Sequence, residues 1–323
     1  MAPFPGRARG DPEAPLTAVA PDLAGSKVAS AREKPEPLRT RIVTKPPSQP
    51  GARAEGTADR EEHFHDTWAQ AEEVGRIDVR RANEACTAPE LRCIHQRLGD
   101  LRGRRVLDLG CGRGETSVYF ALRGAQVTAL DLSTGMLDLT AALAQRHGVS
   151  LRVHHADAQD LRLDPDEKFD VIHAANVLHH VDLKRALPRI LAHLEPAGTF
   201  ISWDPLAYNP VINLYRRIAT KVRTEDEHPL RREDVALLTR QFRRVETRWY
   251  WLSTLSIFIL MAVWQRRNPN RERYWKVVVD EADRWAWLYR PLERLDTLVL
   301  RVLPPLRWWC WNVLILGWEP VAP

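Results

Sequence analysis

Glycines at alternate positions, with acidic side chains on either side, form the stretch of this sequence best suited to chemistry. The glycines that follow the apolar run 106–109 are Gly110, Gly112 and Gly114. Because glycine lacks a Cβ atom, such a loop can turn tightly and let a ligand approach the backbone. A helix beginning near Glu115 would point its free N–H groups at the same ligand. The pattern predicts a nucleotide-type pocket at the carboxyl end of a first β-strand.

Two acids flank this loop and narrow the choice of ligand. Asp131 closes the β-rich run 126–131, and an acid about 20 residues beyond such a loop suits ribose hydroxyls. A dinucleotide is the alternative, but its loop has the spacing G-x-G-x-x-G. Asp108, just before the first glycine, would also repel a pyrophosphate. It suits a ligand with an amino group and a sulfonium cation, or it caps the following turn.

Alternating strands and helices are expected to position these residues. The expected strands cover 106–109, 126–131, 150–155, 169–175 and 199–203, and the expected helices cover 137–146 and 183–194. This alternation predicts an α/β fold, a doubly wound and mostly parallel sheet with helices on both faces. In such folds ligands bind at the carboxyl ends of the strands, where the glycine loop and Asp131 would meet.

The chain resembles the class I S-adenosylmethionine-dependent methyltransferases, of the small-molecule type that includes quinone-biosynthesis enzymes. The matching segments, in the family's order across about residues 100–205, are 108–114, 131–133, 136, 157–158 and 176–180. The resemblance implies a Rossmann-like, seven-stranded sheet with a reversed last strand and S-adenosylmethionine as cofactor. It implies that the glycines lie alongside the methionine moiety of the cofactor, that Asp131 binds the ribose, and that Asp157 and Ala158 contact the adenine. The full set of expected cofactor-binding residues is Asp108, Gly110, Cys111, Gly112, Gly114, Asp131, Leu132, Met136, Asp157, Ala158 and Asn176.

Histidines and an acid at later strand ends are the candidates for proton transfer. His179 and His180 follow the fourth expected strand, and Asp204 follows the fifth. Histidine titrates near neutral pH, and a buried carboxylate with a raised pKa can also accept a proton. We expect His180 or Asp204 to act as the base, with His179 as a further candidate. A purely structural role for the histidines at a helix start stays open.

Aromatic and polar residues beside the expected core are the candidates for binding a methyl acceptor. They are Trp68, Tyr208, Asn209, Tyr215 and Arg216. The helix carrying Trp68 could equally be an amphipathic helix that packs on the sheet. His63 and His65 on that helix lack a partner at metal-ligand spacing, so no metal is predicted.

Composition divides the chain into regions. Residues 1–60 are rich in Pro, Ala and Arg, and are expected to be a disordered tail. Residues 61–253 are expected to form the catalytic core, 254–308 a helical insertion, and 309–323 a closing strand with the C-terminus. The four cysteines have neither zinc nor disulfide spacing, which indicates a reducing cytoplasm. The net charge of +5 does not demand a nucleic-acid partner.

The insertion is rich in tryptophan. We expect strand six over 245–252, a closing antiparallel strand over 311–320, and between them a helical pattern over 271–303. Pro291 should interrupt that pattern and Pro304 should stop it. Three interpretations stay open: a membrane-spanning helix, an interfacial segment that gives peripheral membrane contact, and a helical cap whose tryptophans cover an apolar acceptor pocket.

These features together predict methyl transfer to an oxygen or carbon of a lipophilic small molecule. A prenyl, quinone-like, natural-product or glycolipid acceptor would suit the aromatic insertion. A nucleic-acid methyltransferase is disfavoured because no long basic stripe or aromatic–basic module appears. A non-catalytic protein that keeps the fold as an interaction platform is the remaining alternative.

Overall fold

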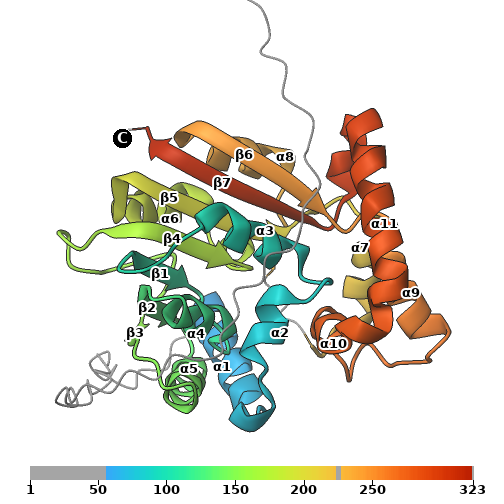
Figure 1. Ribbon diagram of the computed structural model, residues 1–323, viewed down its shortest axis with the longest axis horizontal. Helices are drawn as coiled ribbons and strands as arrows, with labels where there is room; N and C mark the ends of the chain where they lie inside the picture. Colours follow the sequence, from blue (N-terminus) through green and yellow to red (C-terminus); the bar gives the residue numbers. More distant parts are fainter. Residues whose placement is uncertain (1–55, 223–226, 322–323) are drawn as a thin grey trace, which may run out of the picture. The chain divides into compact units, whose positions relative to one another are not determined.

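The computed structural model describes residues 56–222 and 227–321, all within one compact unit. Most of the expected N-terminal tail, residues 1–55, lies outside the described residues. The described chain forms a seven-stranded sheet in the order β3-β2-β1-β4-β5-β7-β6 (Figure 1). The strands are β1 Arg105–Leu109, β2 Gln126–Asp131, β3 Arg152–His155, β4 Phe169–Ala175, β5 Leu194–Pro205, β6 Phe242–Tyr250 and β7 Asn312–Pro320. Only β7 runs antiparallel to its neighbours β5 and β6 among these strands, so the expected reversed last strand is confirmed.

Apolar side chains on both faces hold the sheet between two cores. Along β1, Val106 belongs to one buried cluster and Leu107 and Leu109 belong to the other, as the two-residue repeat of a strand requires. Helices α3 Pro89–Leu98, α4 Glu115–Leu122 and α5 Thr134–Arg146 contribute to the first cluster. Helices α6 Leu183–Leu191 and α8 Arg232–Thr239 contribute to the second. Burial on both faces explains the near-continuous apolar character of the central strands.

Five further elements lie before β1, between β4 and β5, or after β5. They are α1 Thr57–Gln70, η1 Val74–Arg76, α2 Val79–Glu84, η2 Leu178–His180 and α7 Pro210–Ile218. Helix α1 packs against α5, and α2 packs against α4. These two N-terminal helices therefore lie beside the helices that follow the glycine loop and β2.

Several expected boundaries were wrong. The sixth strand covers Phe242–Tyr250 and ends before Trp251, whose φ of 67° breaks the extended backbone. The helix expected over 183–194 ends at Leu191, and Leu194 already begins β5. Pro291 does not interrupt the insertion's helical pattern; it lies inside α11, and the break falls at Glu281. Pro291 is exposed, so water can satisfy the carbonyl group that lacks a proline N–H partner.

The insertion builds a third core of its own. It comprises α9 Ser256–Val263, α10 Tyr274–Asp280, α11 Ala282–Val302 and η3 Pro304–Trp309, beside one end of the sheet (Figure 1). Buried aromatic side chains from α7, the end of β6 and these helices pack together, including Tyr215, Trp251, Phe258, Tyr274 and Tyr289. No helix in the described ranges combines the length and apolar character needed to cross a membrane.

Candidate active site

The glycine loop runs from β1 to the start of α4, and its glycines have different surroundings. Gly110 and Gly112 have φ of 70° and 53°. A Cβ atom on Gly110 would lie 2.1 Å from a methyl group of Val177, whereas a Cβ atom on Gly112 would meet nothing within 4 Å. Gly114 is the N-cap of α4. The open side of this loop is therefore at Gly112, where the chain leaves room for a ligand.

Asp131 faces this loop from the end of β2. Its carboxylate accepts hydrogen bonds from the N–H of Gly112 (2.8 Å) and the N–H of Ser133 (2.9 Å). The structure thus brings the expected ribose-binding acid to the open glycine. Leu132 follows, and its carbonyl oxygen lies 2.6 Å from Nε2 of His155.

Asp108 lies buried beneath the loop, and its expected contact with the cofactor stays a prediction. One carboxylate oxygen accepts from the hydroxyl of Ser117 (2.5 Å), and the other lies 2.7 Å from Nδ1 of His173. Asp108 and His173 are register partners on β1 and β4, and both are buried. Because both carboxylate oxygens have protein partners, Asp108 holds the start of α4 against β1 and β4. The missed partner His173 is visible in sequence only once β1 and β4 are aligned as neighbours.

The other expected cofactor residues line the same edge with different surroundings. Met136 and Cys111 are buried in the first core, and burial raises the pKa of the Cys111 thiol. Asp157 accepts from the N–H of Gln159 (2.8 Å), and Ala158 packs against the second core. Asn176 follows the last residue of β4 and has a φ of 55°. Their contacts with a cofactor stay predictions.

The three candidate proton-transfer residues lie together at the ends of β4 and β5. Nδ1 of His179 lies 2.8 Å from a carboxylate oxygen of Asp204, and both side chains are buried. His180 is partly exposed, and its ring centroid lies 4.1 Å from that of His179. Nδ1 of His180 lies 3.2 Å from a carboxylate oxygen of Glu61 on α1. Glu61 could not be predicted as a partner, because it lies far from the histidines in sequence.

Burial controls the protonation of the inner pair. Desolvation raises the pKa of Asp204 to about 8, although hydrogen bonds from backbone N–H groups oppose this shift. Desolvation also lowers the pKa of His179 well below its ordinary value, helped by the charge of His180. At neutral pH the pair is therefore a protonated carboxyl group beside a neutral imidazole.

The same histidines form a group with metal-ligand potential. His179, His180 and Glu227 each offer one ligand atom, and these atoms lie within 4.8 Å of one another. Imidazole nitrogen and carboxylate oxygen are a common ligand combination for divalent transition metals. From the sequence, only His63 and His65 were candidate metal ligands. The group of His179, His180 and Glu227 was not predicted.

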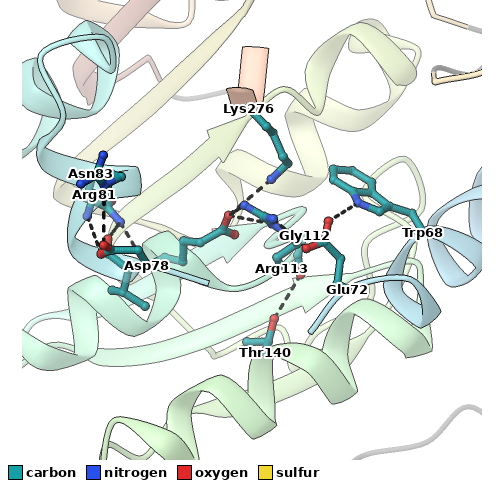
Figure 2. Close-up of polar contacts among 11 residues, drawn as sticks. Trp68, Glu72, Asp78, Arg81, Asn83, Gly112, Arg113, Thr140 and Lys276 are labelled. Carbon is teal, nitrogen blue, oxygen red and sulfur yellow. Dashed lines mark hydrogen bonds and ion pairs between the residues drawn. The ribbon is translucent and has the colours of Figure 1, made fainter. Parts of the chain in front are cut away.

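Trp68 belongs to a network of charges that joins α1, the glycine loop and α10. Its indole N–H donates to Glu72 (2.6 Å), and Glu72 also accepts from Arg113 (2.8 Å) (Figure 2). Arg113 donates to Glu115, and Nζ of Lys276 lies 3.3 Å from the same carboxylate oxygen (Figure 2). The insertion therefore reaches residues in and beside the glycine loop.

The network shifts the protonation of its buried members. Burial alone would raise the pKa of Glu115, but the charges of Lys276 and Arg113 outweigh it and lower the pKa to about 2. Burial lowers the pKa of Lys276 to about 8 against the opposing attraction of Glu115. Arg273 stacks on the Trp68 ring, with its guanidinium carbon 4.0 Å from the centroid. Arg273 and Lys276 could not be assigned from sequence, since no motif marks them.

The remaining acceptor candidates do not form one cluster. Asn209 is the N-cap of α7: its side-chain oxygen accepts from Val211 and Ile212 N–H groups. Its amide group donates to the carbonyl of Trp309. These bonds give the side chain a capping role, and its expected contact with an acceptor stays a prediction.

Tyr208, Tyr215 and Arg216 differ in their surroundings. The Tyr208 hydroxyl accepts from the N–H of Arg232 (3.0 Å). Tyr215 is buried in the aromatic core of the insertion, with its ring centroid 5.3 Å from that of Tyr274. Arg216 donates to Asn213 (3.0 Å), and its charge helps to lower the pKa of His179. Of the three, Arg216 is thus the one tied electrostatically to the histidines.

Comparison with known proteins agrees with this arrangement. Residues 106–198 match a family described as "Methyltransferase domain". The chain is 32% identical over 117 residues to the ubiquinone biosynthesis O-methyltransferase of Bordetella pertussis, covering 36% of this chain and 48% of the relative. It is 34% identical over 120 residues to the enzyme of the same name from Pseudomonas syringae pv. tomato, covering 36% and 50%. The chain thus spans about half the length of these curated relatives.

Solved structures are similar at a lower level. The YcgJ protein of Bacillus subtilis is 18% identical, with a TM-score of 0.46 over 72% of this chain and 99% of that one. Magnesium protoporphyrin IX methyltransferase from Synechocystis, solved with bound SAH, is 17% identical, with a TM-score of 0.39 over 61% and 83%. The matched domain and the relatives identify residues 106–198 as a methyltransferase domain, and the sheet with one reversed strand agrees with the class I S-adenosylmethionine-dependent methyltransferases that the sequence resembles.

Proposed function

We propose that this chain transfers a methyl group from S-adenosylmethionine to an oxygen or carbon atom of a lipophilic small molecule. The observation that carries the proposal is the open side of the glycine loop at Gly112, with the Asp131 carboxylate held against its N–H group. The expected cofactor fits this donor set, because Asp131 can exchange its bond to Gly112 for ribose hydroxyls. Gly112 leaves the backbone accessible beside it.

His180 is the proposed general base. S-adenosylmethionine supplies an electrophilic methyl carbon on a sulfonium that leaves as a neutral thioether. A hydroxyl acceptor must lose its proton as its oxygen–methyl bond forms, and the partly exposed His180 imidazole can take that proton. Glu61, 3.2 Å away, would stabilise the imidazolium that results. Asp204 and His179 act behind His180 as positioning residues, because both are buried.

A bound divalent cation is a second candidate for the same step. The cluster of His179, His180 and Glu227 carries it, because three ligand atoms converge within 4.8 Å. A cation there would lower the pKa of a coordinated acceptor hydroxyl, so that solvent water could take the proton without a protein base. The two candidates differ in their response to a chelator: EDTA leaves turnover unchanged for a base and abolishes it for a cation, with Zn²⁺ or Mg²⁺ restoring it.

The acceptor is proposed to be lipophilic, of the prenyl or quinone-like kind, and the enzyme to contact a membrane surface peripherally. Two observations support this. The insertion gathers aromatic side chains near α7, close behind the end of β5. The curated relatives are named for ubiquinone biosynthesis, although they match only over part of their length. Aromatic side chains close to the site would suit contact with such an acceptor.

A labelled-methyl assay tests this proposal. The full chain is incubated with methyl-labelled S-adenosylmethionine and either a prenylated catechol or the same catechol without its chain. We expect label in the organic extract, with a higher kcat/KM for the prenylated compound. Label that enters RNA or DNA instead would contradict the small-molecule assignment. Cofactor binding without transfer to any acceptor would favour the non-catalytic alternative.

A further inference from the structure

Helix α11 presents an apolar face to solvent on the side opposite to the one that packs on the molecule. The buried face carries Trp285, Tyr289 and Asp296. Large apolar side chains of the same helix remain exposed: Trp287 (74%), Leu295 (45%), Leu298 (59%) and Val302 (66%). An ordinary surface helix buries its apolar stripe and exposes its polar face, so α11 has one apolar face more than its packing requires.

The exposed side chains form one continuous stripe. At 3.6 residues per turn, positions 287, 291, 295, 298 and 302 fall within about 80° of arc and extend for about 22 Å along the axis. Pro291 completes the stripe and is also exposed. The chain continues beyond the helix with two more exposed apolar side chains, Leu303 (53%) and Trp309 (56%). We name the set formed by residues 287, 291, 295, 298 and 302 the α11 stripe.

The charges of α11 are sorted around this stripe. Each acid of the helix has a partner on the molecule. Asp283 pairs with Arg81 (3.0 Å) and Glu293 pairs with Arg92 (2.5 Å). Asp296 accepts hydrogen bonds from the segment 252–254, including the N–H of Ser253 (2.8 Å).

Arg284 of the same helix pairs with Glu281, but two other arginines stay available. Arg294 and Arg301 are exposed and border the stripe, and neither forms an ion pair within the described residues. The solvent side of α11 therefore combines an apolar stripe with uncompensated positive charge.

We propose that the α11 stripe docks on the surface of a lipid bilayer that contains anionic headgroups. Aliphatic side chains on one face, tryptophan near its ends and arginine along its border are the features of a helix lying in the headgroup boundary. A stripe about 22 Å long and ~10 Å wide is far smaller than the ~800 Å² per partner that a stable protein interface buries. A bilayer sets no such minimum area and supplies the negative charge that Arg294 and Arg301 lack.

Vesicle flotation tests this surface, and it needs neither cofactor nor acceptor. The full chain is mixed with vesicles of phosphatidylcholine alone or of phosphatidylcholine with phosphatidylglycerol. We expect binding to the mixed vesicles, reduced at least ten-fold by the double variant Leu298→Glu/Val302→Glu. Leu122→Glu is the matched control, because Leu122 is 49% exposed on a different helix, α4. It should bind as the unchanged chain does.

The arginine border is tested separately. Arg294→Gln and Arg301→Gln should each weaken binding to the mixed vesicles roughly five-fold, with the difference lost at high salt. Thermal melting checks that every variant folds. The proposal is overturned if the double variant floats as well as the unchanged chain or if the unchanged chain binds neither vesicle. It is also overturned if the double variant alters only the oligomeric state, measured by light scattering, since a second copy would then be the occupant.

Discussion

The cofactor loop and the histidine cluster stand at the same edge of the sheet but are built in different ways. The loop is continuous in sequence, and its shape is set by backbone conformation at Gly110 and Gly112. The cluster draws its side chains from α1, η2, β5 and the segment at 227. The loop therefore depends on local backbone conformation, whereas the cluster depends on tertiary packing of distant segments.

The largest expected effect belongs to the cluster. His180→Ala should lower kcat by about 10²- to 10⁴-fold, the usual contribution of a general base. Cofactor affinity should stay within about two-fold, because the loop does not depend on this side chain. His193→Ala is a control, since His193 bonds to the Glu167 carbonyl outside the cluster. Single-turnover kinetics measures kcat, and titration calorimetry measures cofactor affinity. Loss of both cofactor binding and turnover in His180→Ala would show that the loop and the cluster do not act independently.

The second effect separates two glycines of the loop. Gly112→Ala should weaken cofactor binding at least ten-fold while costing about 1 kcal/mol of stability, because its methyl group enters the open side at positive φ. Gly110→Ala should instead destabilise the fold by about 2–4 kcal/mol through its clash with Val177. Denaturant unfolding and calorimetry compare the pair. Equal loss of stability in both variants would refute an open side at Gly112.

The loop was predictable from sequence because its information is local. Glycine spacing, the apolar run before it and the acid at Asp131 each follow from short-range rules, and the structure brings them together. The contacts of Asp108 could not be predicted from local sequence, because they include His173 of a neighbouring strand. The capping role of Asn209 was not predicted either: its side chain accepts hydrogen bonds at the start of α7.

The helical character of the insertion was predictable from sequence, but its contacts with the rest of the chain were not. Its helices and the closing strand follow from sequence patterns. The break at Glu281 and the continuation of α11 past Pro291 depend on packing. Lys276 reaches Glu115 across a long sequence separation, and no motif announces such a pair. Glu61 and Glu227 escaped prediction for the same reason. Side chains brought together by tertiary packing cannot be read from local spacing.

A pH-dependent effect tests the inner pair of the cluster. Burial raises the pKa of Asp204 to about 8, above its ordinary value of 3.8. Between these two pH values the folded chain keeps a proton that the unfolded chain releases. The resulting stability is complete below about pH 4 and is lost as pH rises through about 8.

Asp204→Asn removes this titration. Calorimetric Tm values of the unchanged chain should fall more steeply than those of the variant as pH rises from about 5 to 8. Parallel Tm curves for the two proteins would show that Asp204 is already ionised in the fold.

The smallest expected effect concerns the contact of the insertion with the cofactor loop. Lys276→Met should cost about 1 kcal/mol of stability, because Glu115 keeps its bonds to Arg113. It should raise the acceptor KM a few-fold by loosening α10 over the loop. Lys184→Met on α6 is the control, since Lys184 is exposed and lies on another element. An unchanged KM and Tm for Lys276→Met would show that α10 does not support the loop.

Titration calorimetry with S-adenosylmethionine and its thioether product tests the central claim most directly. The unchanged chain should bind each compound at one site, and Asp131→Ala should weaken binding at least ten-fold while unfolding as a single transition. Asp131 lies 2.8 Å from the open glycine, so its loss should be felt at the ligand and not in the core. Absence of binding to the folded, unchanged chain, or equal binding by Asp131→Ala, would contradict the assignment of this loop as the cofactor site.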